Sequence, residues 1–217
     1  MGGGNCRPLN NKRKIMKKAV FFVVLSIVLF AACGDDDESL EDGTEYSQNM
    51  VDYYVDCDNI ILTAIGSTIK VRFEGEPLTR GKNSEKFFAV AKSNNDTSYN
   101  RKLLPARYAS INDSLSKISI VCDKELNSEY LAGTELSSLF IFRGETVYNI
   151  IRNNYNSYSA EHIVIPANAV SFSQTRIVAP EFELVLNTPP AQSGIYTFDV
   201  SITLSKKTLT GTVKMEF

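Results

Sequence analysis

Residues that commonly carry catalysis are sparse in this sequence. Its single histidine, His162, lies beside Glu161 and precedes the apolar run 163–165. A lone histidine at the start of a strand is more often structural or solvated than a general base, and it cannot form a cluster of imidazole metal ligands. The sequence also lacks a Gly-rich phosphate loop, a Rossmann fingerprint and a Gly-x-Ser-x-Gly nucleophile elbow. We therefore predict no catalytic residue, no metal site and no cofactor.

Carboxylates leave two alternatives open. The segment 56–59, Asp-Cys-Asp-Asn, has the alternating oxygens of a calcium loop, but it lacks the turn glycine and the distal glutamate of an EF-hand. We interpret it as an acidic loop before a strand. A pair of acids for glycoside hydrolysis is a spatial feature, so the 25 Asp and Glu residues keep a carboxylate hydrolase as an alternative.

The N-terminal segment has the layout of a secretory signal. Two lysines precede an unbroken apolar run, 19–30, which two alanines and Cys33 follow. As a helix this run would be roughly 18 Å long, too short for the ~30 Å hydrocarbon core of a bilayer. We expect residues 1–32 to be a signal peptide, and Met16, with two lysines after it, is the more natural start.

The tetrapeptide Phe30-Ala31-Ala32-Cys33 resembles the lipobox of bacterial lipoproteins. In that family, small residues let the signal peptidase reach the cut and the cysteine sulfur receives a diacylglycerol. The resemblance implies that Cys33 carries the lipid, although Phe30 stands where the family usually has leucine. An ordinary cleaved secretion signal is the alternative.

Acidic residues follow this cysteine directly, at Asp35, Asp36, Asp37 and Glu38. Such a run cannot bury itself, so we expect residues 33–49 to form a flexible tether. The pattern is similar to the acidic export signal of surface lipoproteins in the Bacteroidota. It implies a lipid-anchored protein of the outer membrane that faces the cell exterior; a plain spacer is the alternative.

Charge argues against one class of partner. Residues 1–32 hold six of the 23 Lys and Arg residues and none of the 25 acids, so the rest of the chain is strongly acidic. Because binding to nucleic acid depends on clustered Lys and Arg, we expect no nucleic acid partner.

Short alternating segments predict an all-β fold. Residues 196–204 alternate apolar and polar side chains, and the alternation resumes over 209–217 after a polar turn. Other short segments rich in β-branched or aromatic residues predict further strands. These are 59–64, 68–73, 86–91, 117–122, 136–142, 161–165 and 181–186. Many short strands between turns favour one antiparallel β-sandwich over residues 50–217, with two small β lobes as the alternative.

The segment Gly194-Ile195-Tyr196-Thr197-Phe198 resembles the tyrosine corner of immunoglobulin-like domains. The resemblance implies an immunoglobulin-like sandwich; otherwise Tyr196 is a tyrosine at the edge of the core. Segments 121–124 and 132–140 also resemble domain families of gut Bacteroidota lipoproteins, which bring no known activity with them.

Two cysteines remain after the signal is cut and Cys33 is acylated. An oxidising export route permits a disulfide between Cys57 and Cys122. The alternative is a pair of small buried thiols, because both cysteines lie at predicted strand ends.

Two polar stretches are candidate surface sites. Asp113-Ser114-Leu115 resembles the sites at which Bacteroidota O-glycosylate exported proteins, and we expect Ser114 to be exposed between strands. The stretch 152–158 combines Tyr, Asn and Ser, the chemistry of binding loops. Its candidate binding residues are Asn153, Asn154, Tyr155 and Tyr158, although an ordinary polar loop between strands is the alternative.

These features together predict a non-catalytic binding module that a lipid anchor holds on the membrane. Its ligand would be a glycan or a protein. The alternatives are a structural or assembly component, such as a pilus or envelope subunit, and a cryptic carboxylate hydrolase.

The lipobox leads to a direct prediction. The change Cys33→Ala removes the sulfur that would accept the lipid, so the protein should lose its acylation and its retention in the membrane fraction. Metabolic labelling with a fatty acid, together with membrane fractionation, measures both. Normal retention of the variant would contradict the lipobox interpretation.

Overall fold

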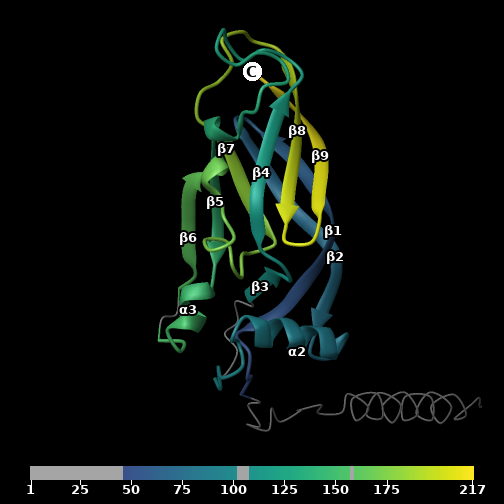
Figure 1. The fold of residues 1–217 in the computed structure, drawn as a ribbon, viewed down its shortest axis with the longest axis vertical. Helices are drawn as coiled ribbons and strands as arrows, with labels where there is room; N and C mark the ends of the chain where they lie inside the picture. Colours follow the sequence, from purple (N-terminus) through teal and green to yellow (C-terminus); the bar gives the residue numbers. More distant parts are fainter. Residues whose placement is uncertain (1–45, 102–107, 157–158) are drawn as a thin grey trace, which may run out of the picture. The chain divides into compact units, whose positions relative to one another are not determined.

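Two β-sheets, of six and three strands, face each other in the part of the chain that the computed structural model describes, residues 46–101, 108–156 and 159–217 (Figure 1). The larger sheet has the order β3-β1-β2-β7-β5-β6 and the smaller sheet β4-β8-β9. The strands are β1 (Val51–Ile65), β2 (Thr68–Thr79), β3 (Tyr108–Ile111), β4 (Leu115–Cys122), β5 (Phe140–Thr146), β6 (Glu161–Pro166), β7 (Glu181–Leu186), β8 (Ile195–Leu204) and β9 (Thr208–Glu216). The helices are α2 (Ser84–Ser93) and α3 (Tyr148–Arg152), with 3₁₀ turns at Ser137–Leu139 and Ala167–Ala169. Within these described ranges, no helix is long and apolar enough to cross a bilayer.

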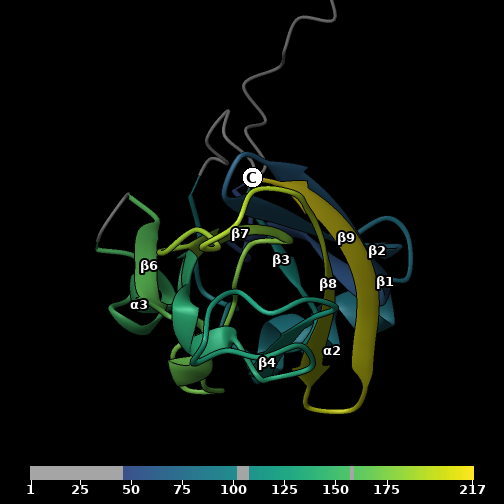
Figure 2. The ribbon, with the colours of Figure 1, turned by 90° about the horizontal axis from the view of Figure 1, so that it is seen from above.

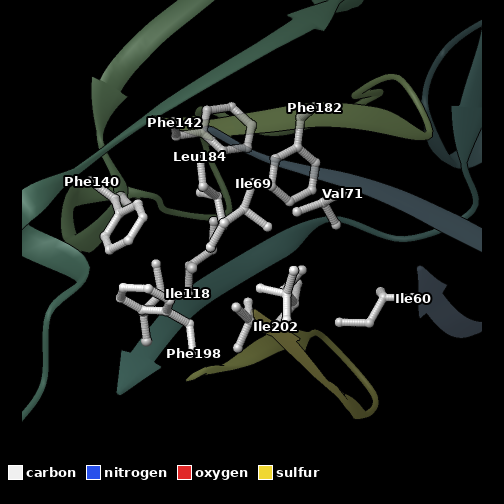
Figure 3. Close-up of a cluster of buried hydrophobic side chains, with 14 of the residues drawn as sticks. Ile60, Ile69, Val71, Ile118, Phe140, Phe142, Phe182, Leu184, Phe198 and Ile202 are labelled. Atoms are coloured by element: carbon white, nitrogen blue, oxygen red, sulfur yellow. The ribbon is translucent and has the colours of Figure 1, made fainter. Parts of the chain in front are cut away.

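The sheets share one apolar core, to which each contributes one side of its alternating strands (Figure 3). Ile69 and Leu184 point into it from the larger sheet, and Ile202 from the smaller. The rings of Phe140 and Phe198 meet edge to face across the two sheets, with centroids 5.8 Å apart. Each such side chain stabilises the fold by about 1.5–3 kcal/mol through burial. The expected all-β fold of two packed sheets is therefore confirmed.

The two sheets approach each other where β9 runs alongside β1 (Figure 2). A Cβ atom placed on Gly211 of β9 would lie 3.0 Å from Leu62 Cδ1 and 3.5 Å from Ile60 Cδ1 of β1. A glycine at this position therefore lets the backbone of one sheet approach the side chains of the other.

Most predicted strands are confirmed. The structure has strands at 117–122, 161–165 and 181–186, and β8 and β9 form the expected terminal hairpin. The strand predicted at 136–142 is only partly confirmed, because a 3₁₀ turn occupies 137–139 and β5 begins at Phe140. The sandwich is also not purely antiparallel, since β3 pairs with β1 in parallel.

The predicted strand at 86–91 is wrong, because these residues lie in α2. The run Phe87-Phe88-Ala89-Val90 has the composition of a short buried strand. Its burial nevertheless follows helical spacing, with Phe87 and Ala91 buried four residues apart and Phe88 exposed. Short apolar runs carry too little periodicity to separate the two structures.

A β-bulge divides the long strand β1. The pairing of β1 with β2 shifts register between Cys57 and Asn59, so that Asp58 is an extra residue opposite Gly75. A Cβ atom on Gly75 would lie 1.9 Å from the backbone oxygen of Asp56. The strand opposite the bulge therefore requires glycine at this position.

A buried carboxylate fixes the start of β1. Asp96 accepts hydrogen bonds from the backbone N–H groups of Met50 (2.8 Å) and Val51 (2.9 Å) and from the Tyr155 hydroxyl (3.1 Å). Its own carbonyl accepts a hydrogen bond from the Asn49 side chain. Burial raises the pKa of Asp96 above its ordinary value, and the bonds from Met50, Val51 and Tyr155 oppose that rise.

A second apolar cluster surrounds this carboxylate. It joins α2, α3 and the first half of β1, and its largest fully buried side chains are Tyr54 and Phe87, whose ring centroids are 5.5 Å apart. Arg80 lies over the Phe87 ring at 5.2 Å and pairs with Asp52 at 3.2 Å. Ser47 is also buried, so the packed structure begins within the segment 33–49 that we expected to be a tether.

The bulge gives a stability prediction. Gly75→Ala should lower the free energy of unfolding by about 2 kcal/mol or more, because the new methyl group collides with the β1 backbone. Gly81→Ala is the matched control, since nothing lies within 4 Å of a Cβ atom there and its backbone is not left-handed. Urea unfolding of both variants measures the difference; equal stabilities would show that the bulge tolerates a side chain.

The buried carboxylate gives a prediction on pH. Native Asp96 binds its proton more tightly than the unfolded chain does, so its contribution to the unfolding free energy falls as pH rises from about 4 through its raised pKa. Asp96→Asn removes this titration. The stability of the variant relative to wild type should therefore increase over that pH range, as measured by urea unfolding at each pH. A constant difference between the two proteins would contradict the raised pKa.

Candidate functional site

The acidic segment 56–59 does not form the calcium loop that its alternating oxygens suggested. Asp56 accepts a hydrogen bond from Asn112 Nδ2 at 2.8 Å and pairs with Lys86, whereas Asp58 pairs with Lys207 at 3.5 Å. No group of three His, Cys, Asp or Glu residues suited to a metal exists among the residues the structure describes. The acidic segment 56–59 is therefore part of β1 and its bulge, and not the loop before a strand that we expected.

The expected disulfide is absent, because Cys57 and Cys122 are separate buried thiols. Cys57 precedes Asp58, which pairs with Lys207 at 3.5 Å in the turn beside the start of β4, whereas Cys122 is the last residue of β4. Seven strand steps separate these ends by roughly 20 Å, and a disulfide needs Cα atoms less than about 7 Å apart. Burial raises the pKa of Cys57 to about 12 and also raises the pKa of Cys122.

The predicted binding loop is wrong for its central tyrosine. Tyr155 is 3% exposed, and its ring meets Tyr99 at 5.2 Å while its hydroxyl bonds to Asp96. Asn153 and Asn154 are exposed at the end of α3. The polar composition of 152–158 suggested a surface loop. Tyr155 is buried instead, because the core offers its ring an apolar contact and its hydroxyl a hydrogen-bond partner.

The expected exposure of Ser114 is also wrong, since this residue is 8% exposed. Its N–H donates to Asp113 Oδ1 at 2.8 Å, and the same oxygen accepts a hydrogen bond from the Ser205 hydroxyl. The short connection between β3 and β4 therefore packs against the turn between β8 and β9. The other sequence-based sites, Cys33, Asp35, Asp36, Asp37, Glu38 and Tyr158, lie outside the described residues.

An open cavity of about 1020 Å³ is lined in large part by side chains on the outer face of the larger sheet, the face directed away from β4, β8 and β9. Strand register places its floor residues in two rows. The first row is Thr63, Lys70, Glu183, Arg143 and Val164. The second has two parts, Ile61, Arg72 and Glu181 on β1, β2 and β7, and the pair Glu145 and His162 on β5 and β6. Below, "the groove" means these ten residues and the cavity above them.

An apolar row borders the groove on the same face. Register aligns Ile65, Thr68, Val185, Ile141 and Pro166 across five strands. Ile65 is 55% exposed, and the other four are half-buried or exposed. The outer face therefore combines a polar floor with an apolar margin.

The charges of the groove are balanced and only partly paired with one another. Lys70 Nζ lies 3.9 Å from Glu183, and His162 Nδ1 lies 3.4 Å from Glu145. Arg143 and Glu181 have no ion pair with any described residue. Arg143 lies directly opposite Glu183, so Glu181, two residues along the same strand, is its diagonal neighbour at roughly 7–8 Å.

The groove can bind both hydrogen-bond donors and hydrogen-bond acceptors of a ligand. The free guanidinium of Arg143 donates only, and the free carboxylate of Glu181 accepts only. A hydroxyl group serves both, because it can accept from arginine and donate to glutamate. The same cavity is also lined by the half-buried Tyr53 and Tyr108, of which Tyr53 packs against the shared core and Tyr108 against the second apolar cluster.

The sequence indicated that several groove residues face away from the core, but not that they lie together in one groove. Alternation in 68–73 and 181–186 already indicates that Lys70, Arg72 and Glu183 face away from the core. It does not show that they share a face with Arg143, because that depends on which strands pair. His162 belongs to the groove, although its sequence neighbours suggested only a strand start.

Comparison of the chain with protein-family models finds no match, and comparisons with curated proteins and with solved structures also find none.

Proposed function

We propose that this chain is a non-catalytic binding module, held on the outer membrane by a lipid on Cys33 and facing the cell exterior. Its ligand would occupy the groove. The observation that supports this function best is the groove itself, which ten outward side chains from five strands of the larger sheet line together.

The ligand that suits this surface is an extended glycan. Charges are present in equal numbers, with Lys70, Arg72 and Arg143 against three glutamates, so the groove favours a ligand without strong net charge. Sugar hydroxyls would bridge Arg143 and Glu181. A segment of a partner protein is the alternative, for which the apolar row beside the groove would provide contact area.

An immunoglobulin-like classification is part of the proposal. Two features support it, namely two facing sheets and the Tyr196 hydroxyl, which donates to the carbonyl of Gln192 at 2.8 Å as in a tyrosine corner. The tyrosine thus ties the entry of β8 to the chain just before it.

One geometric feature favours a second function. Glu181 and Glu183 lie two residues apart on one strand and point into the same groove, at roughly 7 Å by strand geometry. Carboxyl groups about 6.5–9.5 Å apart serve inverting glycoside hydrolases. The pairing of Glu183 with Lys70 and the exposed setting make binding the better supported function.

Binding to an array of purified glycans tests the proposal. Arg143→Ala and Glu181→Ala should each lower affinity for the bound glycan about tenfold or more, because each removes a charged hydrogen-bonding partner. Lys214→Ala is the matched control, since Lys214 is an exposed charge on β9, outside the groove. Calorimetry of the purified protein measures the affinities.

The outcomes separate the candidate functions. Equal losses in the groove and control variants, or no glycan bound, would contradict a glycan site in the groove. Recovery of a shortened glycan after incubation would instead support the hydrolase.

A further inference from the structure

Most sheet edges in the described part of the chain are covered. Backbone bonds from Gly133 to Cys122 (2.8 Å) and from Leu136 to Ile120 (2.7 Å) cover the outer edge of β4. The carboxylate of Glu135 also accepts the Ile120 N–H at 3.0 Å. These contacts leave little of that edge free to pair with another chain.

The remaining edges each carry a feature that β6 lacks. β3 donates from Ile111 to the Val178 carbonyl at 3.1 Å, and β9 carries a lysine, Lys214. β6 has no backbone hydrogen bond on its outer side with any described residue. It also lacks the lysines and bulges that usually protect an exposed edge.

The backbone hydrogen bonds of β5 show which N–H and C=O groups of β6 point away from the sheet. Glu145 of β5 and Leu139, the residue directly before β5, accept bonds from the β7 side, from Ala179 (2.8 Å) and Asn187 (3.0 Å). The odd-numbered residues of β5 therefore direct their backbone groups toward β7, and the even-numbered ones toward β6.

This alternation decides which β6 groups are free. Ile163 and Ile165 are opposite the even-numbered residues of β5 and bond inward. The N–H groups of His162 and Val164 consequently point outward. The backbone of Pro166 also faces outward. Because proline has no N–H, it is tolerated at this free edge, where no bond within the sheet is lost.

The free edge is complementary to itself. In an antiparallel pair of two β6 strands centred on Val164, each Val164 lies opposite the second copy's Val164, and each His162 lies opposite Pro166. All four outward N–H groups then meet carbonyl groups, two at the valines and two at the prolines. No charge faces a like charge, and Val164, 61% exposed in one chain, becomes covered.

We propose that β6 pairs antiparallel with β6 of a second copy of this chain, joining two six-stranded sheets into one. The first groove row ends at Val164, so the rows of the two copies continue into each other across the new pair. Each copy thereby extends the binding surface of the other. This dimer does not require the glycan proposed above.

Crosslinking tests the geometry. Val164→Cys should form a disulfide-linked dimer under mild oxidation, because hydrogen-bonded opposite residues have Cα atoms about 5.5 Å apart, within reach of a disulfide. Thr63→Cys is the matched control, since Thr63 is exposed at the other end of the same row. Equal crosslinking of both variants, or none at Val164→Cys, would overturn the proposal.

Sedimentation of the purified protein over a concentration series tests the edge itself. The interface is small, so we expect a weak dimer that dissociates on dilution. Val164→Pro removes the outward N–H and should abolish the dimer, whereas Val185→Lys, on the same face but inside the sheet, should keep it. Circular dichroism confirms that each variant is folded, and a wild type that stays monomeric throughout overturns the dimer whether or not a glycan binds.

Discussion

The extra residue in β1 is the constraint on which the rest of this structure depends. Before the bulge the odd-numbered residues Val55 and Cys57 face the shared core, and after it the even-numbered Ile60 and Leu62 do. One strand thereby supplies the core over its full length while its direction and twist change. The bulge in turn requires Gly75, because no side chain fits against the Asp56 carbonyl.

The same switch divides the outer face of the larger sheet. Before the bulge Tyr54 faces outward, opposite Leu78, and α2 covers both through Phe87. After the bulge the outward residues are Ile61 and Thr63, which belong to the groove. The covered half is fixed by the buried Asp96, whose three donors hold the start of β1 in place. The open half is left for a ligand.

The buried polar groups of this fold have structural tasks. Asp96 and Tyr155 satisfy each other within an apolar cluster, and the two cysteines fill positions in the core as thiols. Partly free charged groups occur instead on the outer face, at Arg143 and Glu181. The buried polar groups thus stabilise the fold, whereas the charged groups of the outer face remain accessible to a ligand. This difference supports a binding function at the sheet surface.

The sequence by itself determined the local features of this protein. Alternation with a period of two located 181–186 and the terminal hairpin, and it showed which side of each strand is polar, because successive side chains of a strand point to opposite faces. The segment 84–93 was different. Its few apolar residues suit a strand or a helix equally well, and packing of Phe87 against Tyr54 decided between them.

The tertiary structure alone decided which residues meet. A polar stretch such as 152–158 does not reveal that Tyr155 turns back to a carboxylate 59 residues away in the chain. Two cysteines in an exported chain favour a disulfide by composition, yet the fold places Cys122 at the end of β4 and Cys57 on β1, near the start of β4. The groove likewise depends on strand order and register, which bring Arg143, Glu183 and Lys70 into one row. All three depend on contacts between residues far apart in the chain. A single sequence shows the type and local spacing of each residue, but not which distant residue it contacts.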